Sequence, residues 1–143
     1  MSTTLTHSDA TRLEGAQRLA FLPSLFGNDF MISELTVYAY ASRFITGYNG
    51  GYWHYHRLPD GSGYMVPDME NVTFCNPDNW FECEMSAETA GIIITALVLN
   101  HRSFYHCHHD NDELCSHFCR RYEALMSFVD SHPDASTIYR ALD

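Results

Sequence analysis

The spacing of apolar positions along the chain predicts helices on both sides of a small sheet. Apolar residues that recur every third or fourth position indicate helices in four segments: 29–46, 86–104, 112–131 and a short stretch after Pro133. Shorter segments rich in aromatic and β-branched residues, separated by turn signals, indicate strands at 51–58, 63–67, 71–76 and 79–85. We therefore expect an α+β domain with a small antiparallel β-sheet, with hairpins near 51–67 and 71–85, packed with about four helices.

Each predicted helix has its own apolar pattern. "AGIIITALVLN" is apolar nearly all round, which is typical of a buried central helix, and Ser86 is its expected N-cap with Glu88 in the first turn. In the segment 29–46 we expect the core-facing stripe to be Ile32, Leu35, Tyr38, Ser42 and Ile45. In the segment 112–131, which Asp112 would cap, the expected stripe is Leu114, Phe118, Tyr122, Leu125 and Val129.

The stretch "YNGGYWHYHRLPDGSGYMVPD", residues 48–68, reads as a hairpin closed by a Pro-Asp-Gly turn. Its glycines match neither GxGxxG nor GxxxxGK[ST], so they predict bends in the chain and no phosphate-binding loop. With a turn at "PDGS", alternation predicts one face with Trp53, Tyr55, Tyr64 and Val66, and another with His54, His56 and Met65.

The 143 residues and 45% apolar content fit one domain, which we place at 16–143 after a flexible N-terminal segment at 1–15. No apolar stretch reaches the roughly 20 residues of a membrane helix, and the start lacks the pattern of a signal peptide. We therefore expect a cytoplasmic protein. Five cysteines, an odd number, fit free thiols in that compartment.

Charge narrows the possible partners. The chain has 18 acidic residues, eight arginines and no lysine, for a net charge of −10, and no Lys or Arg lies between Leu58 and His101. Direct binding to nucleic acid needs clustered basic residues and is disfavoured. An acidic surface suits a basic protein surface, or it serves solubility alone. The candidate partner-binding residues flank the predicted strands and could gather on one sheet edge: Asp68, Glu70, Glu82 and Glu84.

Two histidine-containing sets could bind metal. His54 and His56 share one face of a strand, and Asp68 could approach them across the hairpin. The richer set lies in 101–119, where a loop at 106–109 could close over the helix that follows and give zinc four ligands: Cys107, His109, Cys115 and Cys119. No CxxC or HExxH spacing appears. The residues favour no metal, no cofactor and no catalytic site, with zinc as an alternative.

Several segments together resemble the plasmid-associated antirestriction family of ArdB and KlcA. They are "FLPSLFGNDFM", "GYNGGYWHYHRLPDGSGYMVPD", "NPDNWF", "SAETAGIIITALVLNH" and "RRYEALMSFVDSHPDASTIYRALD". The most specific piece is a structural signature of six residues: Gly50, Gly51, Tyr52, Trp53, Tyr64 and Met65.

This resemblance implies a small cytoplasmic α+β protein, not an enzyme, that relieves type I restriction of incoming plasmid or phage DNA. The implied partner is a type I restriction-modification enzyme or an associated host DNA-processing protein, contacted by a monomer or weak homodimer. The Cys/His cluster at 101–119 and the pair His54 and His56 depart from the family pattern, and this departure argues against a metal site. Two alternatives stay open: an acidic DNA mimic, and a zinc-stabilised module or zinc enzyme. A compact domain about 32 Å across that mimics duplex DNA would need roughly twenty ordered acidic groups, since the duplex carries one negative charge per ~1.7 Å of its axis.

Overall fold

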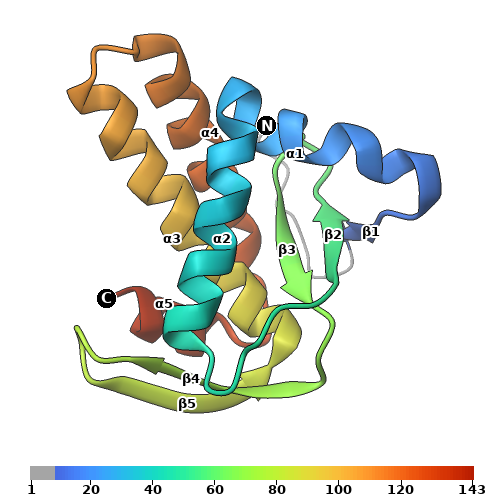
Figure 1. Ribbon diagram of the computed structural model, residues 1–143, viewed down its shortest axis with the longest axis vertical. Helices are drawn as coiled ribbons and strands as arrows, with labels where there is room; N and C mark the ends of the chain where they lie inside the picture. The colour runs from blue at the N-terminus through green and yellow to red at the C-terminus, as the bar shows by residue number, and fades with distance from the viewer. Residues whose placement is uncertain (1–8) are drawn as a thin grey trace.

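The computed structural model describes residues 9–143, and residues 1–8 lie outside the described part of the chain (Figure 1). The elements, in order, are β1 (Thr11–Arg12), the 3-10 helix η2 (Gly15–Ala20), α1 (Phe21–Phe26), η3 (Gly27–Asp29), α2 (Phe30–Phe44), β2 (Trp53–Arg57), β3 (Gly63–Pro67), β4 (Asn71–Asn76), β5 (Phe81–Ser86), α3 (Ala87–His108), α4 (Asp112–Val129) and α5 (Ala135–Leu142). The α+β class is confirmed. The strands form two sheets, β1-β2-β3 and β4-β5, where the sequence predicted one.

Helix α3 is the central helix, as its apolar composition predicted. Its N-cap is Ser86, whose Oγ accepts a hydrogen bond from the Thr89 N–H at 3.1 Å. The helix lies directly on β3, because Gly91 has no side chain: a Cβ there would stand 2.1 Å from the Met65 carbonyl oxygen. The Met65 N–H also donates to Thr95 Oγ1 at 3.0 Å. Strand β3, between β2 and α3, is therefore buried along its whole length.

The β2-β3 hairpin has a different register from the predicted one. Tyr55 lies opposite Met65, and His56 lies opposite Tyr64, so Tyr64 and Val66 share the histidine face and the prediction was wrong by one residue. The connection contains five residues, 58–62, because Leu58 leaves the strand and is buried in the core. Its N–H closes the loop by donating to the Ser62 carbonyl at 2.8 Å.

The buried face of the segment 29–46 differs from the predicted stripe, of which Ile45 is buried and Tyr38 is partly buried. Leu35 is 66% exposed and Ile32 is 54% exposed. The buried α2 residues are Ser33, Val37, Ala41 and Phe44. The helix is turned because Ser33 donates to Asp29 Oδ2 at 2.7 Å inside a buried polar cluster, and because Phe44 stacks on Phe74 of β4 at 5.4 Å.

The last part of α3 also differs from the prediction. Residues 106–108, expected in a loop at 106–109, continue the helix to His108. Helix α4 then returns antiparallel beside α3 (Figure 1). Asn111, rather than Asp112, caps α4 by accepting a hydrogen bond from the Leu114 N–H at 3.1 Å. Of its expected stripe, Phe118, Leu125 and Val129 are fully buried and the other two members are partly buried.

From Thr11 onward the chain is part of the fold. Residues Thr11 and Arg12 pair with β2, and the Leu13 N–H donates to the Tyr55 carbonyl at 2.9 Å. Leu13 is buried. This differs from the flexible segment expected over 1–15, of which residues 1–8 lie outside the described residues. None of the helices in residues 9–143 combines the length and the apolarity that a membrane crossing demands.

Candidate functional site

The candidate surface is the segment Asp68–Ser86, which we name the acidic arm. It contains the link after β3 and the β4-β5 hairpin, which runs beneath the helices in Figure 1. Residues alternate between two faces along each strand, and the inward face is apolar except for Asn76: Val72, Phe74, Asn76, Phe81, Cys83 and Met85. A bridge from Phe74 to Ile45 joins the hairpin to the end of α2. The arm is thus fixed by its inner face, and its outer face is left to solvent.

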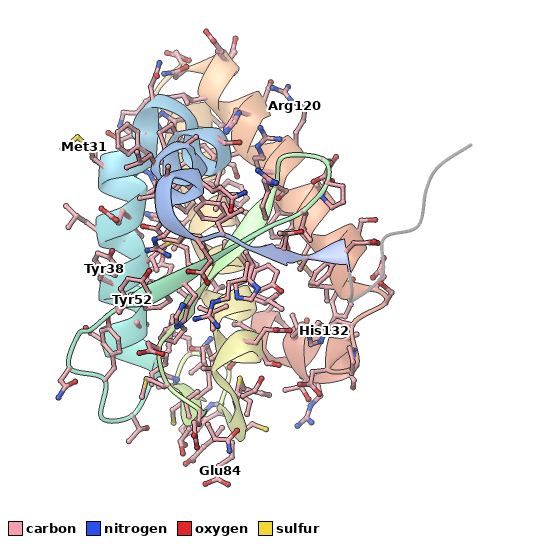
Figure 2. All side chains as sticks on the ribbon, turned by 90° about the vertical axis from the view of Figure 1, so that its right-hand side faces the viewer. Met31, Tyr38, Tyr52, Glu84, Arg120 and His132 are labelled. Atoms are coloured by element: carbon pink, nitrogen blue, oxygen red, sulfur yellow. The ribbon has the colours of Figure 1, made fainter. Side chains whose placement is uncertain are left out.

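Two of the four predicted carboxylates share this outer face. Glu82 and Glu84 are both exposed, two residues apart on β5, which places them roughly 7 Å apart along the strand. Glu84 lies opposite Thr73 and borders a shallow hollow of about 440 Å³ on the hairpin. Figure 2 shows Glu84 at the extreme lower end of the molecule.

Asp68 and Glu70 lie in the link between the two sheets, and both are exposed. The Glu70 carbonyl accepts a hydrogen bond from the Ala87 N–H at 2.9 Å, which places Glu70 at the start of α3, beyond the end of the β4-β5 ladder. Asp68 turns toward the first sheet, where its Oδ1 lies 3.0 Å from His54 Nε2. Glu82 and Glu84 therefore share one face of the hairpin, while Asp68 faces β2, and the role of all four carboxylates in binding stays a prediction.

The carboxylates of this surface differ in whether they have an ion-pair partner. Asp68 has His54 as a partner, and Asp78 at the hairpin tip has Arg43. Within the described residues, the carboxylates of Glu70, Glu82 and Glu84 make no hydrogen bond or ion pair. Since an exposed carboxylate without a partner attracts cations, this face can receive guanidinium or ammonium groups.

The predicted histidine pair has structural contacts. The His56 ring stacks on Tyr64 at 4.9 Å between centroids, and burial lowers the pKa of His56, which favours a neutral ring. His54 lies edge-on to Tyr52, with Arg12 and Asp68 beside it. Both histidines are therefore used in joining β2 to its neighbours.

The alternative zinc set is not assembled in the expected way. Residues 106–108 are helical, so no loop closes over Cys115 and Cys119, and the His106 ring points into the interior at 3.1 Å from Asp29. Desolvation and the neighbouring thiols of Cys107 and Cys119 raise the pKa of Cys115 to about 11, so it stays protonated at neutral pH. In residues 9–143, no three His, Cys, Asp or Glu side chains are placed to hold a metal ion.

The six signature residues divide between core and surface. Trp53, Tyr64 and Met65 are buried, while Gly50, Gly51 and Tyr52 are exposed. Both glycines have positive φ, 96° and 122°, which explains the bend before β2. The same loop borders a hollow of about 500 Å³ against Tyr38 and Ser42 of α2.

Two features were missed by the sequence reasoning. Trp80 is 93% exposed at the tip of the acidic arm, and its only sequence signal is its place directly after an Asn-Pro-Asp-Asn turn. Asp29, the residue directly before α2, and Arg102 of α3 form a buried ion pair. No local pattern connects two residues that stand 73 positions apart.

Comparison with known proteins shows which sequences and which solved structure this chain is similar to. Residues 46–143 match the family model of antirestriction proteins. YubI of Escherichia coli strain K12 is 45% identical over 132 residues, covering 92% of this chain and 93% of its own. The antirestriction protein KlcA of Escherichia coli is 38% identical over 136 residues, 94% of each chain. A solved structure, also 38% identical, superimposes with a TM-score of 0.81 over 100% of both chains. It comes from work on KlcA and ArdB that describes a novel fold and antirestriction activity against type I DNA restriction systems in vivo but not in vitro.

Proposed function

This chain belongs to the antirestriction protein family, and we propose that it relieves type I restriction of incoming plasmid or phage DNA by contacting a protein, without catalysis. The observation that carries the proposal is the match over the whole chain to the fold described for KlcA and ArdB, which act against type I systems in vivo. The place of action is the cytoplasm, where a type I enzyme meets incoming DNA.

The contact surface of this proposal is the outer face of the acidic arm. Support comes from Glu70, Glu82 and Glu84, which are exposed and have no partner within the described residues. A basic partner surface would gain both association rate and specificity from these charges. The partner is the type I restriction-modification enzyme or a host DNA-processing protein associated with it. Activity of KlcA and ArdB in vivo but not in vitro favours the second, because a purified enzyme lacks such host factors.

Wholesale DNA mimicry is poorly supported by the distribution of acidic groups. Several carboxylates already have an arginine or histidine partner within the fold: Asp29 with Arg102, Asp68 with His54, Asp78 with Arg43 and Glu88 with His132. A mimic needs ordered, uncompensated charges at the spacing of phosphates, roughly one per 1.7 Å. The acidic groups that remain are suited to a local patch.

The test is the plating efficiency of unmodified phage on a type I restricting host that expresses the protein. We expect plating to rise toward that on an isogenic host without the restriction system. A parallel assay adds the purified protein to purified type I enzyme and unmodified DNA, and separates direct inhibition from dependence on a host factor. Unchanged plating at confirmed expression would refute the proposal.

A further inference from the structure

Trp80 occupies a position that its own folding contacts do not explain. The side chain is 93% exposed, whereas Trp53, the other tryptophan, is 3% exposed. Its φ is 59°, in the left-handed region that bulky residues rarely adopt. Large exposed aromatic surface and a strained backbone are both unfavourable for folding. A non-glycine residue held in such a conformation points to function.

The loop around Trp80 is held in place by its asparagines. Asn76 Oδ1 accepts a hydrogen bond from the Asp78 N–H at 3.0 Å, and Asn79 Oδ1 accepts one from the Phe81 N–H at 3.1 Å. Asn79 Nδ2 also donates to the carbonyls of Ala141 and Asp143, at 3.0 and 2.9 Å. Figure 1 shows the hairpin tip beside the C-terminus, where these bonds form. The indole is thus presented on a braced loop, which lowers the entropy lost when it binds.

The charges around Trp80 are predominantly negative. The acidic arm carries five carboxylates and neither Lys nor Arg: Asp68, Glu70, Asp78, Glu82 and Glu84. Two cations approach the tip from other elements. Arg43 pairs with Asp78, and Arg140 lies over the Phe81 ring at 5.6 Å. Arg140 also lines the hollow of about 320 Å³ beside Trp80. Glu82, two residues from Trp80, has no partner within the described residues.

We propose that Trp80 anchors the acidic arm on an arginine-rich surface of a protein partner, with its indole face against a guanidinium and Glu82 and Glu84 against neighbouring cations. A guanidinium is attracted by the electron-rich face of an indole, and exposed tryptophans dominate many interfaces. Nucleic acid and anionic membranes are disfavoured as occupants, because this arm and the net charge of −10 repel phosphates. This inference rests on the proposed function, which it deepens by naming the anchor and the partner's chemistry.

A fluorescence experiment tests the chemistry without a known partner. Acrylamide should quench Trp80 selectively in the wild-type protein, because Trp53 is buried. We expect a nona-arginine peptide to shield Trp80 from acrylamide more strongly than nona-lysine, and expect added salt to weaken the effect. Nona-glutamate, anionic lipid vesicles and a single-stranded oligonucleotide should give no shielding. Shielding by vesicles or oligonucleotide, or none by nona-arginine, would overturn the proposal.

Three variants separate anchoring from folding. Trp80→Gly removes the ring and suits the left-handed backbone, so it should fold at least as well as wild type and bind labelled nona-arginine about tenfold more weakly or worse. Trp80→Phe should retain part of the affinity. Leu19→Ala truncates an apolar side chain that is 82% exposed on η2 and should bind as wild type. A folded Trp80→Gly variant with wild-type affinity contradicts the anchor.

Phage plating tests the Trp80 anchor separately from the proposed function on which it rests. If wild-type protein fails to protect, the proposed function fails, and the peptide titration still decides the chemistry of Trp80. If wild type protects and folded Trp80→Gly protects equally, the anchor is wrong and the function stands. The expected result is protection by wild type and by Leu19→Ala, with protection largely lost in Trp80→Gly.

Discussion

Arg102 on α3 holds Asp29 in a bidentate ion pair inside the protein, with Nε at 2.7 Å from Oδ2 and Nη2 at 2.9 Å from Oδ1. Ser33 donates to the same carboxylate, and the His106 ring lies 3.1 Å from it. All four residues are buried. The pair joins the start of α2 to the C-terminal third of α3, on the side where α2 buries Ser33.

Breaking this pair should be strongly destabilising. Arg102→Met leaves the Asp29 carboxylate buried without its main partner, and we expect a loss of about 3–5 kcal/mol in the free energy of unfolding. Urea unfolding of purified protein measures it. The matched control is Arg43→Met, which removes an exposed pair with Asp78 and should cost less than about 1 kcal/mol. Equal, small losses in both variants would contradict the structural role of Arg102.

The same cluster predicts a direction for acid sensitivity. Burial alone would raise the pKa of Asp29, but hydrogen bonds from Arg102 and Ser33, together with His106, outweigh it and lower this pKa. The stabilisation is therefore complete above the unfolded pKa, near 3.9, and is lost as pH falls through the lower folded value. Ser33→Ala should raise the folded pKa and move acid unfolding, followed by circular dichroism, to higher pH. An unchanged acid midpoint would argue against this coupling.

Trp53 should be essential to the fold. It is buried, its indole N–H donates to the Tyr48 hydroxyl at 2.9 Å, and its ring packs against Tyr38 at 5.9 Å. We expect Trp53→Ala to cost about 3–5 kcal/mol and to reduce protection only as far as folded protein is lost. Trp80→Ala, the exposed counterpart, should change stability by no more than about 0.5 kcal/mol. A Trp53→Ala variant with wild-type melting temperature would contradict this prediction.

Neutralising the acidic arm should spare folding and weaken protection. The variant combines Asp68→Asn, Glu70→Gln, Glu82→Gln and Glu84→Gln, and each change should alter stability by no more than about 0.5 kcal/mol. Protection should fall, because a charged interface loses association rate when its charges are removed. Plating efficiency measures the effect, and circular dichroism confirms folding.

A control variant with the same change in net charge isolates position from total charge. It combines Asp110→Asn, Asp112→Asn, Glu113→Gln and Glu123→Gln, which are exposed at the α3-α4 turn and along α4. This turn lies at the opposite end of the molecule from the acidic arm (Figure 1). We expect the control to protect as wild type. Equal protection by both quadruple variants would show that the arm is only a solvated face.

The protein should not bind DNA directly. Its net charge of −10 and lack of lysine oppose contact with phosphates. Fluorescence anisotropy with labelled duplex and single-stranded DNA, at roughly 150 mM salt, should show no binding in the micromolar range. A micromolar dissociation constant under these conditions would contradict the prediction from net charge, and DNA would again be a candidate ligand.

Local chemistry explains which predictions from sequence succeeded. The Ser86 cap, the burial of α3 and the Pro-Asp-Gly turn at Pro59 depend on residues close together in the chain, and each is confirmed. Net charge and the basic-free span from Leu58 to His101 are likewise properties of the sequence itself, as is the resemblance to antirestriction proteins, which the comparisons bear out.

Tertiary structure decided what depends on distant partners. The spacing of apolar residues predicted a stripe with Ile32 and Leu35, yet both are exposed, and α2 buries the face of Ser33 and Val37. This face begins at the ion pair of Asp29 with Arg102, which lies 73 residues further along the chain. Burial of Leu58 adds a residue to the hairpin loop and reverses the faces of β3, because a one-residue slip exchanges every side chain between faces. The loop that carries the exposed Trp80 is held by hydrogen bonds from Asn79 to the carbonyls of Ala141 and Asp143. In each case the free energy comes from contacts between segments far apart in the chain, and local periodicity carries no information about them.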